Sequence, residues 1–112
     1  MIVEDSLTYR NILKTMLAKT NVRIIEVKDG QEALEIFKTT KEKISLVITD
    51  YEMPVMDGID LTIKLREIYG KDELSIIAIS SSEDKSVIDD FLTFGANDFI
   101  VKPFSLSEVR LR

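Results

Sequence analysis

The sequence predicts an α/β fold in which a five-stranded parallel sheet is doubly wound, with helices on both of its faces. Five short apolar runs alternate with segments whose apolar residues recur at helical spacing. The central runs lack the polar alternation of a half-exposed strand, which is expected when helices cover both faces. Charged residues close three of the runs. In open α/β sheets, ligands and reacting groups collect at the carboxyl ends of the strands.

The strands are predicted, in chain order, from apolar and β-branched runs. They cover residues 1–3, 22–27, 44–49, 75–79 and 98–101. The first run is followed by Glu4 and Asp5, the third by Asp50, and the fifth by Lys102. The carboxyl edge of the sheet is therefore expected to collect three carboxylates and one ammonium group.

The helices are predicted from apolar periodicity and from end signals. They cover residues 6–19, a segment opened by Asp29, residues 58–69, residues 83–94 and a short last helix opened by Ser105-Leu106-Ser107-Glu108. Ser6 is a candidate N-cap, and Asp29 stands at capping-box spacing before Glu32. Gly70 and Gly95 stop the third and fourth helices. The residues expected on buried helix faces are Leu13, Met16, Leu17, Ala33, Leu34, Phe37, Leu61, Leu65, Ile68, Phe91 and Phe94.

Composition excludes several classes of protein. The chain has 112 residues, of which 45% are apolar, so it can form one domain with a core. A net charge of −5 argues against nucleic-acid binding by this segment. No apolar run is long enough to cross a membrane, and no signal-peptide pattern is present. Cysteine is absent, which fits a cytoplasmic location. Histidine is also absent, so any imidazole chemistry must come from another chain.

Both ends of the sequence suggest a longer protein. The first strand has only three residues before the acidic pair, and the last helix has only about two turns, which is marginal for an isolated helix. We therefore expect residues 1–112 to form one domain that is a fragment of a longer chain.

The charged residues at the strand ends predict a particular chemistry. Glu4, Asp5 and Asp50 would repel one another unless a cation neutralised them. Oxygen ligands with room for water suit Mg²⁺. A carboxylate nucleophile, a hard divalent metal and a lysine are the parts needed for phosphoryl transfer to a protein. Taken singly, each acidic residue could also be a turn or helix-cap residue.

Five motifs together resemble bacterial response-regulator receiver domains (CheY-like) of two-component signalling. They match in order and spacing over the whole chain. The motifs are Val3-Glu4-Asp5-Ser6, Ile48-Thr49-Asp50-Tyr51-Glu52-Met53-Pro54-Val55-Met56-Asp57-Gly58, Ile79-Ser80-Ser81, Gly95-Ala96-Asn97-Asp98 and Lys102-Pro103-Phe104. The resemblance implies a flavodoxin-like fold with strand order 2-1-3-4-5.

The resemblance implies a Mg²⁺ site built from four residues. Asp50 matches the aspartate that is phosphorylated and that also binds the metal, and Asp5 matches a direct metal ligand. Glu52 matches the position whose backbone carbonyl completes the metal shell. Glu4 matches a second acidic position, which commonly holds the metal through water.

The resemblance also implies which residues contact the phosphoryl group and respond to it. Lys102 matches the lysine that pairs with it, and Ser80 matches the hydroxyl residue that hydrogen-bonds one of its oxygens. Phe99 matches an aromatic switch position where tyrosine is frequent. The Lys102-Pro103 peptide bond matches one that is usually cis in the family.

The implied function is that of a phosphoacceptor rather than an enzyme, beyond its own phosphorylation and dephosphorylation. The implied partner is a sensor histidine kinase or phosphotransfer protein, which supplies the phosphoryl group for Asp50. The output is a change at the face of the fourth helix, fifth strand and fifth helix, where a second copy of the chain could also bind. Residues 80–82 and 95–100 are similar to receivers fused to diguanylate cyclase output domains.

Three alternatives remain at this stage. A phosphatase of the haloacid-dehalogenase type also uses an aspartate after a strand, Mg²⁺ and a lysine, but it needs a second aspartate where this chain has Glu52. A degenerate receiver could act as a binding module, although such domains usually lose the acceptor or the lysine. A flavin-binding flavodoxin would need a hydroxyl-rich phosphate loop after the first strand, which this sequence lacks.

Overall fold

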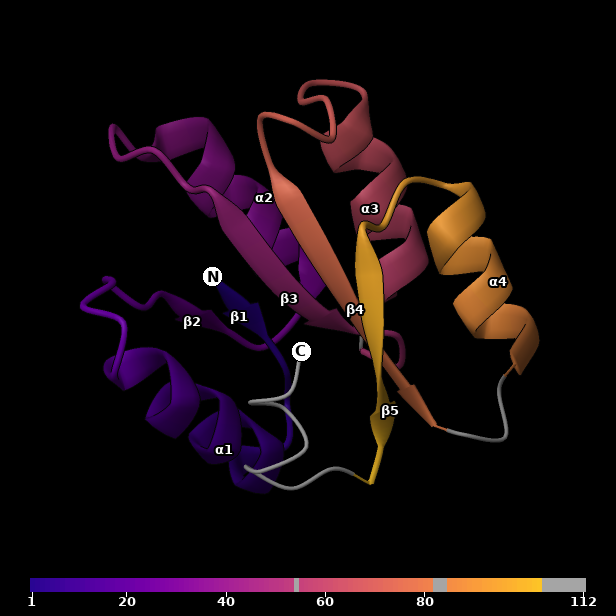
Figure 1. Cartoon of the computed structure of the whole chain (residues 1–112). Coiled ribbons are helices and arrows are strands. Elements are labelled where there is room, and N and C mark those ends of the chain that lie inside the picture. The colour runs from indigo at the N-terminus through magenta and orange to yellow at the C-terminus, as the bar shows by residue number, and fades with distance from the viewer. Residues whose placement is uncertain (54, 82–84, 104–112) are drawn as a thin grey trace.

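The structure, a computed structural model, describes residues 1–53, 55–81 and 85–103. Within them, five parallel strands form one sheet in the order β2-β1-β3-β4-β5 (Figure 1). The strands are β1 (Ile2–Val3), β2 (Glu26–Val27), β3 (Leu46–Asp50), β4 (Ser75–Ser81) and β5 (Asp98–Lys102). The predicted fold class and strand order are confirmed.

Helices cover both faces of the sheet, as predicted. They are α1 (Leu7–Ala18), α2 (Gly30–Thr39), α3 (Gly58–Arg66) and α4 (Lys85–Thr93). Successive strand residues point to opposite faces, so β1, β3, β4 and β5 each contribute to two separate cores. One core packs α1 residues against Ile2, Ile48, Ile79 and Ile100. The other packs α2, α3 and α4 residues against Val3, Val47 and Ala78. Among the helices of the described residues, α1 therefore covers one face, while α2, α3 and α4 share the second face.

Several predicted boundaries differ from the structure. The second strand is limited to Glu26–Val27, much shorter than the predicted residues 22–27. In contrast, β4 and β5 run on to Ser81 and Lys102, so two of the predicted site residues lie within strands. Ser6 occupies the N-cap position of α1, but its side chain makes no cap hydrogen bond. The helix predicted to begin at Ser105 lies outside the described residues.

Two residues predicted to be buried are exposed. Ile68 is 63% exposed because α3 ends at Arg66. After the helix the chain turns away from the helix axis. The Arg66 guanidinium donates to the carbonyl oxygens of Tyr69, Gly70 and Leu74 in this following segment. Phe94 is 45% exposed because α4 ends at Thr93, whereas Phe91 on the same helix is fully buried.

Gly58 joins the start of α3 to the end of β3 at a distance that only glycine allows. Its N–H donates to Tyr51 O at 3.0 Å. A Cβ atom at this position would lie 2.1 Å from the Asp50 carbonyl oxygen and 2.8 Å from Phe91 Cζ. Because one of these atoms is backbone, a larger residue would have to displace β3 or the helix. The close approach therefore helps to fix the backbone of Asp50.

We predict that Gly58→Ala lowers the free energy of unfolding by about 3 kcal/mol, because overpacking forces the backbone to shift. Gly70→Ala is the matched control, since its Cβ would meet only Glu73 Oε1 at 3.5 Å. That variant should remain within about 0.5 kcal/mol of wild type. Urea unfolding of the three proteins measures both effects. Equal losses in the two variants would contradict the close packing of Gly58 on Asp50.

Candidate functional site

The carboxyl ends of adjacent strands bring three acidic side chains together. Glu4 and Asp5 directly follow β1, and Asp50 is the last residue of β3. The register pairs Val3 with Thr49, so the two strands end side by side. One carboxylate oxygen from each of the three residues lies within 4.8 Å of the others. We call Glu4, Asp5 and Asp50 the acidic pocket.

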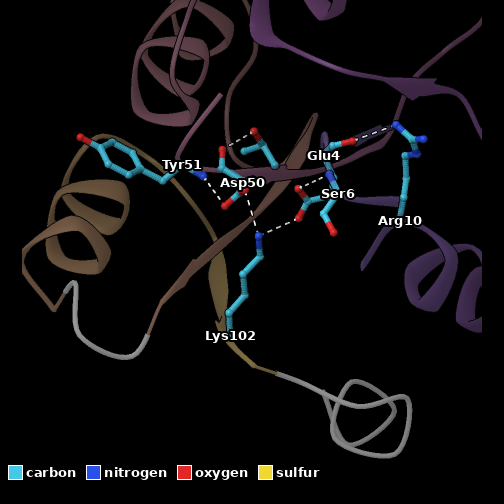
Figure 2. Close-up of polar contacts among 7 residues, drawn as sticks. Glu4, Ser6, Arg10, Asp50, Tyr51 and Lys102 are labelled. Carbon is cyan, nitrogen blue, oxygen red and sulfur yellow. Dashed lines mark hydrogen bonds and ion pairs between the residues drawn. The ribbon is translucent and has the colours of Figure 1, made fainter. Parts of the chain in front are cut away.

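Lys102 reaches the acidic pocket from the far side of β4. It ends β5, which is separated from β3 by β4 in the sheet. Its Nζ donates to Asp50 Oδ2 at 3.0 Å and also lies 3.0 Å from Glu4 Oε1. Figure 2 shows the ammonium between the two carboxylates. The long lysine side chain thus ties the ends of three strands to one another.

The two buried carboxylates have different local partners. Asp50 Oδ1 accepts a hydrogen bond from Tyr51 N at 2.8 Å. Glu4 is fully buried, and its Oε2 accepts a hydrogen bond from Ser6 N at 3.1 Å. Glu4 Oε1 accepts no hydrogen bond of good geometry among the described residues, so its compensation there is the ion pair with Lys102. Asp5, in contrast, is exposed at the mouth of the pocket.

The crowding of these charges shifts two pKa values. Burial and repulsion by Asp50 raise the pKa of Glu4 to about 7, although Ser6 N–H and Lys102 act in the opposite direction. Burial lowers the pKa of Lys102, but its contacts with Asp50 and Glu4 outweigh that effect and raise the pKa overall. The pocket therefore holds three carboxylates, of which Glu4 and Asp50 contact its one ammonium group, and it carries an excess of negative charge.

The donor set of the pocket fits a hard divalent cation. All three side chains offer oxygen, and Asp5 opens onto a solvent-accessible cavity of about 530 Å³ that leaves room for water ligands. Tyr51, Glu52, Met53 and Asp57 also line this cavity. The acidic cluster thus resembles a magnesium site of the kind the sequence predicts.

The remaining predicted site residues differ in how they are placed relative to the pocket. Ser80 follows the register partner of Asp50 on β4 and is buried, and its hydroxyl has no hydrogen-bond partner among the described residues. Glu52 is exposed. Phe99 on β5 is half-buried against the core shared by α2, α3 and α4. The Lys102-Pro103 peptide bond is cis.

Sequence reasoning missed Tyr9 as a neighbour of the pocket. The Lys102 Nζ lies 4.5 Å from the centroid of the Tyr9 ring. Tyr9 stands four residues after Asp5, about one helical turn, and this spacing was the available signal. It was not decisive, because an aromatic residue in a first helical turn is equally typical of a core position.

Comparison with known proteins identifies the family. A family model described as the response regulator receiver domain matches residues 1–112. The chain belongs to this family. A receiver domain is a signalling module and not a conventional enzyme, so the phosphatase and flavodoxin alternatives are set aside.

Individual relatives agree with this assignment. The probable transcriptional regulator ycf27 of Porphyridium aerugineum is 37% identical over 112 residues, which are 100% of this chain and 45% of that protein. A solved structure of a probable two-component system response regulator/GGDEF domain protein has a TM-score of 0.89 and 39% identity. The match covers 99% of this chain and 45% of that one. The chain thus spans less than half of these two relatives.

A third relative carries a metal in the corresponding fold. The receiver domain of sensor histidine kinase PA1611 from Pseudomonas aeruginosa PAO1 has a TM-score of 0.78 and 25% identity, covering 98% of this chain and 88% of that one. That structure has a magnesium ion coordinated in its active-site cleft.

None of the helices described for the present chain has the length and apolarity needed to span a membrane.

We predict that Glu4→Gln removes a pH-dependent loss of stability. The folded-state pKa of Glu4 is raised from 4.5 to about 7, so the stabilising protonated form is fully present below pH 4.5 and is lost as the pH rises through 7. Without divalent metal, wild type should therefore lose stability relative to Glu4→Gln as the pH rises from 4.5 through 7. The loss should be on the order of 2 kcal/mol in the free energy of unfolding.

Urea unfolding in chelator across this pH range measures that difference. Glu42→Gln is the control, because Glu42 is an exposed carboxylate paired with Arg23. It should give a curve parallel to wild type. Parallel curves for Glu4→Gln as well would show that Glu4 does not hold its proton in the folded protein.

Proposed function

We propose that this receiver domain accepts a phosphoryl group on Asp50 in a Mg²⁺-dependent reaction, from a phosphohistidine of a sensor histidine kinase or phosphotransfer protein. The observation that carries the proposal is the 3.0 Å contact of Asp50 Oδ2 with Lys102 Nζ inside a cluster of three carboxylates. This arrangement supports the proposal, because phosphoryl transfer to a protein needs a carboxylate, oxygen ligands for a divalent metal and an ammonium group close together.

Asp50 is suited to be the nucleophile. Its backbone is fixed by β3 and by the close approach of Gly58, and one side-chain oxygen is oriented by Tyr51 N. In the proposed step an Asp50 oxygen attacks phosphorus, a P–O bond forms, and the P–N bond to the histidine breaks. The bonding electrons leave with the imidazole. Lys102 stabilises negative charge on the transferred group, and water later hydrolyses the acyl phosphate.

The acidic pocket would hold the metal. Asp5 and Asp50 would supply carboxylate ligands, and Glu52 would supply its backbone carbonyl. Glu4 would act through a water molecule, which suits its position because it is fully buried and already engaged with Ser6 N and Lys102. When bound, Mg²⁺ supplies positive charge that offsets the repulsion between the phosphoryl group and these carboxylates.

Ser80 and Phe99 are the residues we assign to the conformational response. A buried hydroxyl without a partner costs about 1–3 kcal/mol, and a phosphoryl oxygen would give Ser80 the missing hydrogen bond. Movement of Ser80 would leave space for the half-buried Phe99 to turn inward. The surface of α4, β5 and the expected fifth helix would then change, since phosphorylation favours one of two states.

The setting of the domain is part of the same proposal. One relative contains a GGDEF domain, which supports a diguanylate-cyclase type of output domain in a longer chain. A kinase or phosphotransfer partner implies a cytoplasmic location. A second copy of the chain would bind through the surface of α4, β5 and the fifth helix.

We predict that acetyl phosphate with Mg²⁺ adds one phosphoryl group to wild type and none to Asp50→Asn, because the amide cannot form the acyl phosphate. Intact-mass analysis measures the adduct. Asp60→Asn, which changes an exposed carboxylate on α3, is the control and should be labelled like wild type. Wild type in chelator should remain unlabelled. Labelling of Asp50→Asn, or metal-independent labelling of wild type, would overturn the proposal.

A further inference from the structure

The ammonium group of Lys102 has a third neighbour besides the two carboxylates. Nζ lies over the Tyr9 ring, 4.5 Å from its centroid, while Asp50 and Glu4 oxygens each lie 3.0 Å away. The Lys102 side chain is only 20% exposed. An ammonium group close to an aromatic face is attracted by the ring, and the attraction grows when the pair is shielded from water. Tyr9 therefore contributes one wall of the space that holds this charge.

The position of Tyr9 is fixed by its helix. The neighbouring Arg10 anchors the first turn of α1, since its Nη1 donates to Glu4 O at 3.2 Å and its Nε lies 3.3 Å from Glu26 Oε1. The half-buried Tyr9 side chain also packs against the core under α1. The first turn of α1, which carries Tyr9, is thus tied to the residue after β1 and to the first residue of β2 by contacts that use no carboxylate of the acidic pocket.

The three contacts of Lys102 respond differently to the proposed reaction. A metal ion would engage Asp50 directly and Glu4 through water, and phosphorylation would bond one Asp50 oxygen to phosphorus. Both events would change the two contacts that hold the ammonium group in the metal-free protein. Neither the metal nor the phosphoryl group would change the Tyr9 ring. Without this ring, the flexible Lys102 side chain could adopt many orientations once its contacts with Asp50 and Glu4 changed.

We propose that Tyr9 is a positioning residue for phosphoryl transfer, whose ring keeps the Lys102 ammonium directed at Asp50 while the carboxylates are engaged by metal and phosphate. This inference rests on the proposed function. It predicts that the ring face matters and that its effect passes entirely through Lys102.

The test compares rates of labelling by acetyl phosphate at fixed Mg²⁺. Tyr9→Leu should slow labelling by between about threefold and thirtyfold, whereas Tyr9→Phe, which keeps the ring, should stay within about twofold of wild type. Tyr9→Met preserves bulk without an aromatic face and should match Tyr9→Leu, so the comparison stands if the leucine variant does not fold. Tyr69→Leu is the control for loss of a half-buried tyrosine elsewhere; Tyr69 packs on Phe37.

A double-mutant cycle separates positioning from a structural role. In the Lys102→Ala background, Tyr9→Leu should cause no further loss of rate, because the residue through which it acts is gone. An NMR measurement adds a readout without phosphorylation. The ε-methylene protons of Lys102 should show a ring-current shift that Tyr9→Phe keeps and Tyr9→Leu loses.

The outcomes distinguish the two proposals. If wild type is not labelled at all, the proposed function fails and the positioning role fails with it. If wild type is labelled but Tyr9→Leu or Tyr9→Met is labelled equally fast, the assignment of Tyr9 alone is overturned. The same holds if Tyr9→Leu slows labelling equally with and without Lys102, or if the ring-current shift is absent from wild type.

Discussion

The ion pairs of Lys102 with Asp50 and Glu4 are the interactions on which the site depends. Both contacts are 3.0 Å long, and they join the last residue of β5 to the last residue of β3 and to the residue that follows β1. One ammonium group cannot neutralise three carboxylates, so the pocket keeps a net negative charge. Because the pocket is partly buried, this charge is costly. A site of this kind favours added positive charge, which is the physical reason that it suits a divalent cation.

The fold supplies this charge cluster through simple geometry. Parallel strands end at the same edge of the sheet, so residues far apart in the sequence meet there without any long loop. Packing on the two faces then fixes details that the strands alone would leave open. Gly58 brings α3 against the Asp50 backbone, and Arg10 ties α1 to the end of β1. Each side of the sheet therefore positions a different part of the pocket.

The sequence was sufficient to predict the fold class and the gathering of Glu4, Asp5, Asp50 and Lys102, because alternation of elements and charged strand ends are local signals. It could not predict that Ile68 and Phe94 would be exposed, since this depends on where α3 and α4 end in three dimensions. The different burial of Glu4 and Asp5 and the Tyr9 contact were also beyond it. These features arise from packing between elements, for which neighbouring residues in the chain carry no decisive signal.

Calorimetric titration with Mg²⁺ tests the central claim most directly, namely that the excess negative charge of the acidic pocket forms a cation site. Wild type should bind Mg²⁺ with an affinity that rises from about pH 6 to about pH 8, because the ion competes with the proton on Glu4. Binding near the lower pH should release protons, seen as a heat that depends on the buffer. Asp5→Asn and Asp50→Asn should bind far more weakly. Absence of binding to wild type, or binding unaffected by both substitutions, would contradict the account.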